Sequence, residues 1–551
     1  MIIYQVLTRL FGNDKTVLVP NGTKEQNGCG KMADFTLKAL EEIQSLGATH
    51  IWFTGIIEHA TQTDYTAYGI KADHSDVVKG KAGSAYAIKD YYDVDPDLAE
   101  KVPYRMKEFQ NLVTRSHKAG LKVIIDFVPN HVARQYHSDV CPEGTEDLGA
   151  GDDTRQGFSN QNNFYYIPGE SLHLDNIKAG STYQENPAKA TGNDVFSAWP
   201  GCNDWYETVK LNYGVDICAG RIGHFTPLPD TWKKMLDILL FWAAKGIDGF
   251  RCDMAEMVPV EFWEWAIPQV KDAYPGIFFI AEVYNPAEYR NYIHRGHFDY
   301  LYDKVGLYDT LKAVAQGNAS AQTITSCWQQ VDDIRLHMLN FLENHDEQRI
   351  ASDFFVGDAN KGRAPLLVSA LMSKNPFMLY FGQELGERGM DKEGFSGCDG
   401  RTTIFDYWTV DTVRRWRSKG KFDAKLLSEE ELSLQQFYSN VLRLKEQEPA
   451  FSKGEFFDLM YQNPCLHQQY VFARKCDKEV VLVIANFSEE EQYVQVNIPS
   501  HMFEFWKLRE RLGCVATDML TGKRLKLDFC TGKPLCVSVP ALNGVVLKIG
   551  V

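Results

Sequence analysis

Short apolar, strand-like runs alternate with helix-like segments over roughly the first 420 residues of the chain. A strand, a helix and another strand, repeated many times along one chain, indicate a parallel sheet with crossover helices. From this alternation alone, an open sheet and a closed (β/α)₈ barrel both remain open. The predicted strands are MIIYQVLTR (1–9), THIWFTG (49–55), LKVIIDFVPNH (121–131), GIDGFRCDM (246–254), IFFIAEVY (277–284), LHMLNFLENHD (336–346) and PFMLYFGQE (376–384).

The predicted helices lie between these strands and have amphipathic spacing. One of them ends at Gly120, a residue type suited to the left-handed conformation that follows many helices. The predicted ranges are Phe35–Leu46, Arg105–Ala119, Thr231–Lys245, Val260–Ala273 and Arg363–Met372, with a later helix at Glu430–Glu446.

Two regions break this rhythm. Residues 132–225 are rich in Gly, Asn, Asp and aromatic residues and are too long for a loop without structure of its own, so we expect an inserted domain. After about residue 427, short alternating segments separated by turns predict an antiparallel β-sandwich. These segments are QQYVFARK (468–475), VVLVIANF (480–487), EQYVQVNI (491–498) and NGVVLKIG (543–550).

Charged residues stand at the C-terminal ends of two predicted strands. Arg251 and Asp253 are two residues apart, so they project from the same face of their strand, and a charged pair there is costly unless it is paired or functional. Glu282 ends the next strand. Adjacent strands lie about 5 Å apart, which suits the carboxyl separation of about 5–5.5 Å in a retaining glycosidase. The alternative is an Arg–Asp bridge that only closes the floor of a barrel.

Two further strand ends carry the same residue types. Asp346 lies beside His345 in FLENHD, and Asp126 precedes Asn130 and His131 in DFVPNH. A lone His beside a strand is usually structural. Four strand ends that each carry a carboxylate, two of them with His, instead indicate a site at one edge of the sheet.

These four segments resemble the signature regions of the α-amylase superfamily, glycoside hydrolase family 13. DFVPNH (126–131), GFRCDMAE (249–256), FIAEVY (279–284) and FLENHD (341–346) occur in the family's order. The resemblance extends to YQVLTRLF (4–11), GSAYAIKDYYDVDP (83–96), VKLNYG (209–214), FGQELGE (381–387) and RLKEQEPAF (443–451). It implies a (β/α)₈ TIM barrel with a domain inserted after strand 3 and a C-terminal antiparallel β-sandwich. The corresponding ranges are 1–131 and 226–427 for the barrel, 132–225 for the inserted domain B, and 428–551 for the end of the barrel and the sandwich.

The resemblance also implies a reaction and a role for each residue. The expected activity is retaining hydrolysis of α-glucosidic bonds, with α-1,4 bonds of starch-derived polysaccharides or maltooligosaccharides as the expected substrates. Asp253 would be the nucleophile, Glu282 the general acid/base, and Asp346 would hold sugar hydroxyls in the transition state. Tyr86, His131, Arg251 and His345 would contact substrate, with Arg251 also keeping Asp253 ionised, and Asp126 and Asn130 would support them.

The chain departs from the family pattern after the nucleophile. Glu256 and Met257 stand where calcium-dependent α-amylases usually have Lys and His, which help to bind calcium and substrate. The chemistry is expected to need no cofactor, and a structural calcium ion is left open. Ala87 follows Tyr86, where relatives that cut short oligosaccharides often have Asp and many endo-amylases have Trp. Chain-length preference is therefore also open.

The sequence also allows other functions to be considered beside hydrolysis. A transglycosidase of the same family, such as a glucanotransferase or an isomerase, would use the same carboxylates, with Trp199 and Trp205 as candidate acceptor contacts. A catalytically inactive carbohydrate-binding or scaffold homologue is disfavoured because the three carboxylates are present. GCGK (28–31) lacks the spacing of a phosphate-binding loop, and no His-rich zinc motif occurs.

The charge and composition of the chain limit the classes of partner that it is expected to bind. The net charge of −15 and the absence of a basic run argue against nucleic acid or an anionic membrane, so the expected partner is an α-glucan or maltooligosaccharide. The scattered cysteines, the lack of a signal peptide in the first residues and the lack of a long apolar run predict a cytoplasmic protein. Oligomeric state stays open.

Overall fold

The computed structural model describes residues 1–550, and its centre is a closed barrel of eight parallel strands. The neighbours around the barrel follow the order β1-β16-β15-β14-β13-β12-β5-β2. The (β/α)₈ fold class is therefore confirmed. The barrel strands are β1 (Ile2–Leu7), β2 (His50–Thr54), β5 (Lys122–Phe127), β12 (Gly249–Cys252), β13 (Phe278–Ala281), β14 (Tyr300–Tyr302), β15 (Met338–Phe341) and β16 (Phe377–Tyr380).

All the predicted barrel strands form, and the structure adds an eighth, β14, that the sequence did not reveal. The barrel interior is a packed core in which side chains from nearly every strand meet at its axis. Its buried residues are Ile3, Trp52, Ile124, Ile280, Tyr302, Tyr308, Leu339, Phe341 and Met378.

The six predicted helices form, with ends within two residues of the predicted ones, and the structure adds α7, α8, α9 and α11. Gly120 follows the α4 helix with a φ of 80°, the left-handed conformation expected of it. The main helices are α3 (Leu37–Ser45), α4 (Arg105–Lys118), α5 (Asp230–Ala243), α6 (Val260–Ala273), α7 (Tyr289–His294), α8 (Asp309–Ala315), α9 (Thr323–Gln330), α10 (Arg363–Leu371), α11 (Asp411–Arg417) and α12 (Glu429–Gln447).

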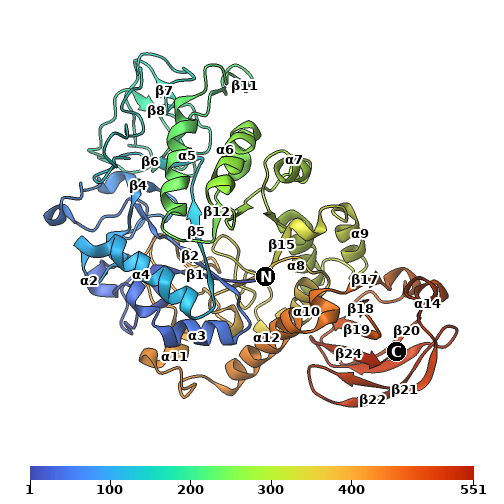
Figure 1. Cartoon of the computed structure of the whole chain (residues 1–551). Helices are drawn as coiled ribbons and strands as arrows, with labels where there is room; N and C mark the ends of the chain where they lie inside the picture. Colours follow the sequence, from blue (N-terminus) through green and yellow to red (C-terminus); the bar gives the residue numbers. More distant parts are fainter. Residues whose placement is uncertain (551) are drawn as a thin grey trace.

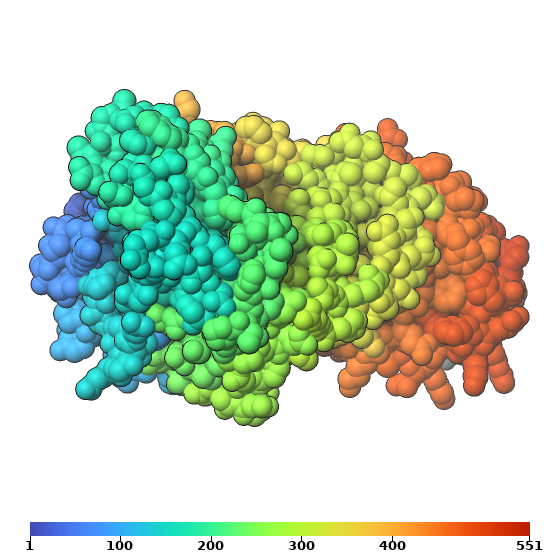
Figure 2. Space-filling model, turned by 90° about the horizontal axis from the view of Figure 1, so that it is seen from above, coloured from blue at the N-terminus to red at the C-terminus, as the bar shows by residue number. Residues whose placement is uncertain are grey.

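Residues 132–225 form a region of short strands at one end of the molecule, far from the C-terminal sheet (Figures 1 and 2). Its three two-stranded sheets pair β6 with β9, β7 with β8, and β10 with β11. It has a small core of its own around Leu172, Leu174 and Ala198. The exact domain boundaries remain predictions. The strands are β6 (His131–Ala133), β7 (Tyr166–Ile167), β8 (Ala188–Lys189), β9 (Thr208–Lys210), β10 (Val215–Asp216) and β11 (Ile222–Gly223).

The C-terminal part is antiparallel, as predicted. A six-stranded sheet has the order β17-β18-β19-β24-β21-β22, and β20 pairs with β23 in a second, two-stranded sheet. Its strands are β17 (Glu455–Asp458), β18 (Gln469–Cys476), β19 (Glu479–Asn486), β20 (Gln492–Val496), β21 (Arg511–Asp518), β22 (Arg524–Phe529), β23 (Leu535–Val539) and β24 (Gly544–Gly550). Within residues 1–550, no helix has the length and apolar character needed to cross a membrane.

Candidate active site

The ends of adjacent barrel strands bring the predicted carboxylates together. The last residues of β12 and β13, Cys252 and Ala281, are partners in the parallel register, so Asp253 and Glu282 leave neighbouring strands at the same level. On the other side of β12, Arg251 is the register partner of Asp126 on β5. The barrel thus sets these groups side by side at its C-terminal edge, where active sites of this fold lie.

A single guanidinium group connects the two carboxylates. Arg251 Nη1 donates to Asp253 Oδ1 at 2.7 Å, and Nη2 donates to Glu282 Oε2 at 2.8 Å. Arg251 Nε donates to the hydroxyl of Tyr302 on β14 at 3.1 Å. Arg251 is fully buried. It therefore lies beneath the carboxylates, where it orients them, and the predicted pairing with Asp253 extends to Glu282.

Burial dominates the electrostatics of this pair. Burial raises the pKa of Asp253, and the Arg251 guanidinium only partly opposes this effect. The pKa of Glu282 is also raised by burial, opposed by Arg251 and reinforced by the charge of Asp253. The expectation that Arg251 lowers the pKa of Asp253 is correct for the pairwise contact, but the net direction is upward because the site is buried.

The carboxylates open into a cavity of about 590 Å³, within the size range of small-molecule sites. Five of the nine predicted site residues line it: Tyr86, His131, Asp253, Glu282 and Asp346. The other four, Asp126, Asn130, Arg251 and His345, are buried and contact members of this set. The structure thus gathers all nine in one place, five at the surface of the cavity and four behind it.

Asp346 and His131 line this cavity, and His345 lies directly behind Asp346. His345 Nε2 lies 3.1 Å from Asp346 Oδ2, and the His345 ring stacks on Tyr86 with centroids 5.0 Å apart. Burial lowers the pKa of His345 well below its usual range and lowers the pKa of His131 to about 3, so both imidazoles are neutral hydrogen-bonding groups. Burial, then the nearby Glu282, raises the pKa of Asp346, although 42% of its side chain is exposed and water screens part of this effect.

Several residues of the site were missed by sequence reasoning. The hydroxyl of Tyr284 donates to Glu282 Oε1 at 2.5 Å, and the backbone N–H of Met254 donates to Glu282 Oε2 at 2.8 Å. Met254 adopts a left-handed conformation, with φ 44° and ψ 40°, that is uncommon outside glycine. The position of Tyr284 could have been predicted from the sequence. It is two residues from Glu282, and in an extended chain such residues project to the same side.

Most of the remaining lining residues lie outside the motifs that the sequence analysis used. Of the two tryptophans considered in the insert, Trp205 lines the cavity and lies 5.2 Å from the ring of His131. Trp199 does not line it; this side chain is 55% exposed and stacks on His173 at 3.9 Å. The remaining lining residues are Lys79, Ser84, Glu207, Thr208, Met254, Tyr284, Lys304, Val305, Glu347, Ile404 and Phe405.

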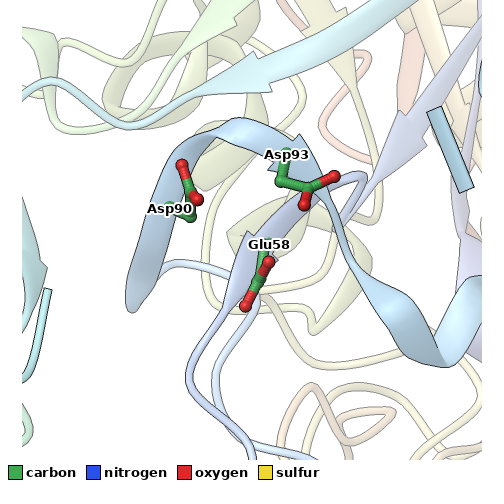
Figure 3. Close-up of side chains that lie close together, drawn as sticks. All are labelled: Glu58, Asp90 and Asp93. Atoms are coloured by element: carbon green, nitrogen blue, oxygen red, sulfur yellow. The ribbon is translucent and has the colours of Figure 1, made fainter. Parts of the chain in front are cut away.

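A separate group of three carboxylates lies close together outside the lining of this cavity. Glu58 on β3 (Ile57–His59) and Asp90 and Asp93 on β4 (Ile88–Val94) have ligand atoms within 4.8 Å of one another (Figure 3). Cationic side chains already lie against this group, because Arg105 pairs with Asp93 and Lys89 Nζ is 3.7 Å from Glu58 Oε1. Burial also raises the pKa of Glu58 to about 9, which leaves it neutral. Arg105, Lys89 and the protonation of Glu58 therefore offset the negative charge of this group without a metal ion.

Comparisons with known proteins show which family and fold the chain resembles. The family model described as "Alpha amylase, catalytic domain" matches residues 21–421. Neopullulanase 2 of Thermoactinomyces vulgaris is 21% identical over 96% of the chain and 75% of its own length. A cyclomaltodextrinase of Bacillus sp is 22% identical over 88% of the chain and 72% of its own length. Among solved structures, a maltogenic α-amylase of Thermotoga neapolitana superposes with a TM-score of 0.64 at 18% identity, covering 100% of this chain and 99% of that one.

Proposed function

The chain belongs to the α-amylase family and is an α-amylase-type glycoside hydrolase, and on that premise we propose that it cleaves α-1,4 bonds of maltooligosaccharides or starch fragments with retention of configuration. Asp253 is the proposed nucleophile, Glu282 the proposed general acid/base and Asp346 the proposed transition-state ligand. The observation that carries this assignment is the Arg251 guanidinium shared by Asp253 and Glu282 at the wall of the cavity.

The first step forms a glycosyl ester on Asp253. Its Oδ1 is held by Arg251, whereas its Oδ2 is buried without a hydrogen-bond partner and is the oxygen that attacks the anomeric carbon. The bond from that carbon to the leaving oxygen breaks, and Glu282 gives its proton to this oxygen. The two residues follow register partners on adjacent strands, which suits the short carboxyl separation of retaining enzymes, about 5–5.5 Å.

The second step reverses these roles. Once Asp253 is an ester it carries no charge, so its contribution to the raised pKa of Glu282 disappears, while burial still raises that pKa and Arg251 still opposes it. Glu282 then accepts a proton from water, the water oxygen attacks the anomeric carbon, and the carboxylate of Asp253 leaves. The neutral imidazoles of His131 and His345 and the ring of Tyr86 are proposed to hold the sugar at the cleavage point.

The deciding experiment follows the anomeric protons by NMR while the enzyme digests maltoheptaose. Initial release of the α-anomer supports retention, whereas initial release of the β-anomer contradicts it. In Asp253→Asn we expect a loss of turnover of about 10⁴-fold or more. Asp303→Asn is the matched control: Asp303 is a buried carboxylate just after β14, it does not line the cavity, and Asn keeps the acceptor for the N–H of Leu307. An Asp253→Asn enzyme with near-native turnover would rule out the nucleophile.

Transfer to a sugar acceptor is the second candidate reaction. The ring of Trp205 in the cavity wall beside His131 favours it, because an aromatic face binds the apolar face of an acceptor sugar. Products longer than maltoheptaose in the same digest would indicate transfer.

A cytoplasmic location remains part of the proposal. All twelve cysteines are unpaired, which suits a reducing compartment, and cell fractionation tests it.

A further inference from the structure

A buried lysine stands at the junction of the barrel and the insert. Lys210 ends β9, where it is the antiparallel partner of His131 on β6, and only 3% of the residue is exposed. Its ammonium donates to Asn130 Oδ1, lies 2.9 Å from Asp194 Oδ1 and donates to the backbone carbonyl of Met257 at 3.3 Å. An amide oxygen, a carboxylate oxygen and a carbonyl oxygen thus surround one positive charge.

These oxygens come from three separate segments that frame the cavity. Asn130 belongs to the loop after β5, Asp194 to the insert, and Met257 to the short helix that follows Asp253. Amide, carboxylate and backbone carbonyl oxygens are the ligands that calcium takes in proteins. Calcium, however, needs six to eight oxygens at about 2.3–2.6 Å, and the Lys210 ammonium already occupies the point where these oxygens converge. The residues present here do not fit a calcium ion.

We propose that the Lys210 ammonium is a built-in cation that replaces a structural metal ion at this junction and positions both walls of the active-site cavity. On one wall, Asn130 Nδ2 lies 3.1 Å from His131 Nδ1, so the ammonium fixes the amide that contacts the imidazole. On the other wall, the N–H of Met257 donates to the carbonyl of Met254, the residue directly after Asp253. Lys210 is thus a positioning residue that acts through Asn130 and Met257.

The other contacts of these groups support a fixed junction. Asn130 Nδ2 also donates to the carbonyl of Gly192 in the insert at 2.8 Å. The second carboxylate oxygen of Asp194 accepts from Arg221 at 2.7 Å, and that arginine is largely exposed. If the exposed Arg221 side chain turns into solvent, Asp194 still keeps its contact with Lys210. Lys210 is the buried cation at the centre of the junction.

The first test compares the wild-type protein, Lys210→Met and Lys445→Met. Lys445 is a matched control: it is equally buried, and its ammonium donates to the carbonyls of Ala370 and Ser373, away from the cavity. We expect both variants to melt at lower temperature than the wild type. Only Lys210→Met should also lose about tenfold in kcat/KM, as the removal of groups that orient site ligands does. Equal kcat/KM in Lys210→Met and the wild type would overturn the positioning role.

The second test uses calcium itself. The wild-type melting temperature should be the same in EDTA and in millimolar CaCl₂, and calorimetry should detect no calcium binding. Lys210→Asp removes the ammonium and adds a fourth oxygen ligand, so its melting temperature should rise with added calcium, while that of Lys210→Met should not. Stoichiometric calcium binding by the wild type, accompanied by a higher melting temperature, would overturn the proposal.

These outcomes do not depend on one another. If Lys210→Asp fails to fold even with calcium, the calcium titration of the wild type and the kcat/KM of Lys210→Met still test the proposal. The effect through His131 rests on the proposed function, whereas the melting and calcium readouts need no substrate. Failure of the glycosidase assignment would therefore leave the built-in cation open to test.

Discussion

Replacing Arg251 by Met tests the idea that one cation supports both of the proposed catalytic carboxylates, Asp253 and Glu282. The substitution removes hydrogen bonds to Asp253 Oδ1, Glu282 Oε2 and the Tyr302 hydroxyl. Removing one partner of a buried ion pair typically costs about 3–5 kcal/mol, because a buried charge loses its compensation. We expect a loss of stability of this size at neutral pH.

The pH dependence of that loss has a definite sign. Without Arg251 the pKa values of Asp253 and Glu282 rise further above their unfolded values. Between the unfolded and the folded pKa the native state binds more protons than the unfolded state, so stability falls as pH rises. The gap in melting temperature between wild type and Arg251→Met should therefore be small near pH 4 and widen toward neutral pH.

Activity should respond in the same direction. A charge-assisted hydrogen bond contributes about 1.5–3 kcal/mol, so its loss should raise the pKa of Asp253 further. In the variant, the acidic limb of the pH profile of kcat/KM should move to higher pH, with a lower maximum. The assay is initial-rate maltoheptaose hydrolysis from pH 4 to 10, corrected for the folded fraction.

Arg349→Met is the matched control for these measurements. Arg349 is also fully buried and donates to Glu343 at 2.9 Å, but neither residue lines the cavity. It should lose stability without a shift of the pH profile. The reasoning is refuted if Arg251→Met keeps the wild-type profile, or if its stability deficit is largest at acidic pH.

Two further substitutions test the parts of the site that the sequence did not reveal. The Tyr284 hydroxyl stabilises the charged form of Glu282, so Tyr284→Phe should raise the pKa of Glu282 and move the alkaline limb of the kcat profile to higher pH; a limb that stays in place contradicts this contact. Trp205→Ala should lower the ratio of transfer to hydrolysis products in a chromatographic digest of maltoheptaose, and an unchanged ratio would remove Trp205 from the acceptor side.

The sequence predicted the barrel because its strands are apolar runs separated by amphipathic helices, and it predicted the site because polar residues follow four of those runs. The strand β14 was not predicted because it is only three residues long, YLY at 300–302, and does not form part of a longer apolar run. The omission affects the chemistry of the site as well as the topology, because Tyr302 on β14 is one of the four hydrogen-bond partners of Arg251, with Asp126, Asp253 and Glu282. The cavity wall at Lys79 and Phe405 could not be predicted either, since loop shape does not follow from local pattern.

Hydrogen-bond partners are the other information that the sequence could not supply, because burial raises the pKa of Asp253 and Glu282 alike. Spacing alone places an arginine beside Asp253 and makes Asp253 and Glu282 look equivalent. The structure distinguishes them by hydrogen bonds: Glu282 accepts from Arg251, Tyr284 and the N–H of Met254, whereas Asp253 keeps one buried oxygen without a partner. An oxygen that is desolvated and unpaired loses no hydrogen bond when it attacks carbon. In its proposed role as general acid, Glu282 would have to release the Tyr284 hydroxyl before Oε1 could give a proton to a leaving sugar, and this contact would couple substrate binding to the protonation of Glu282.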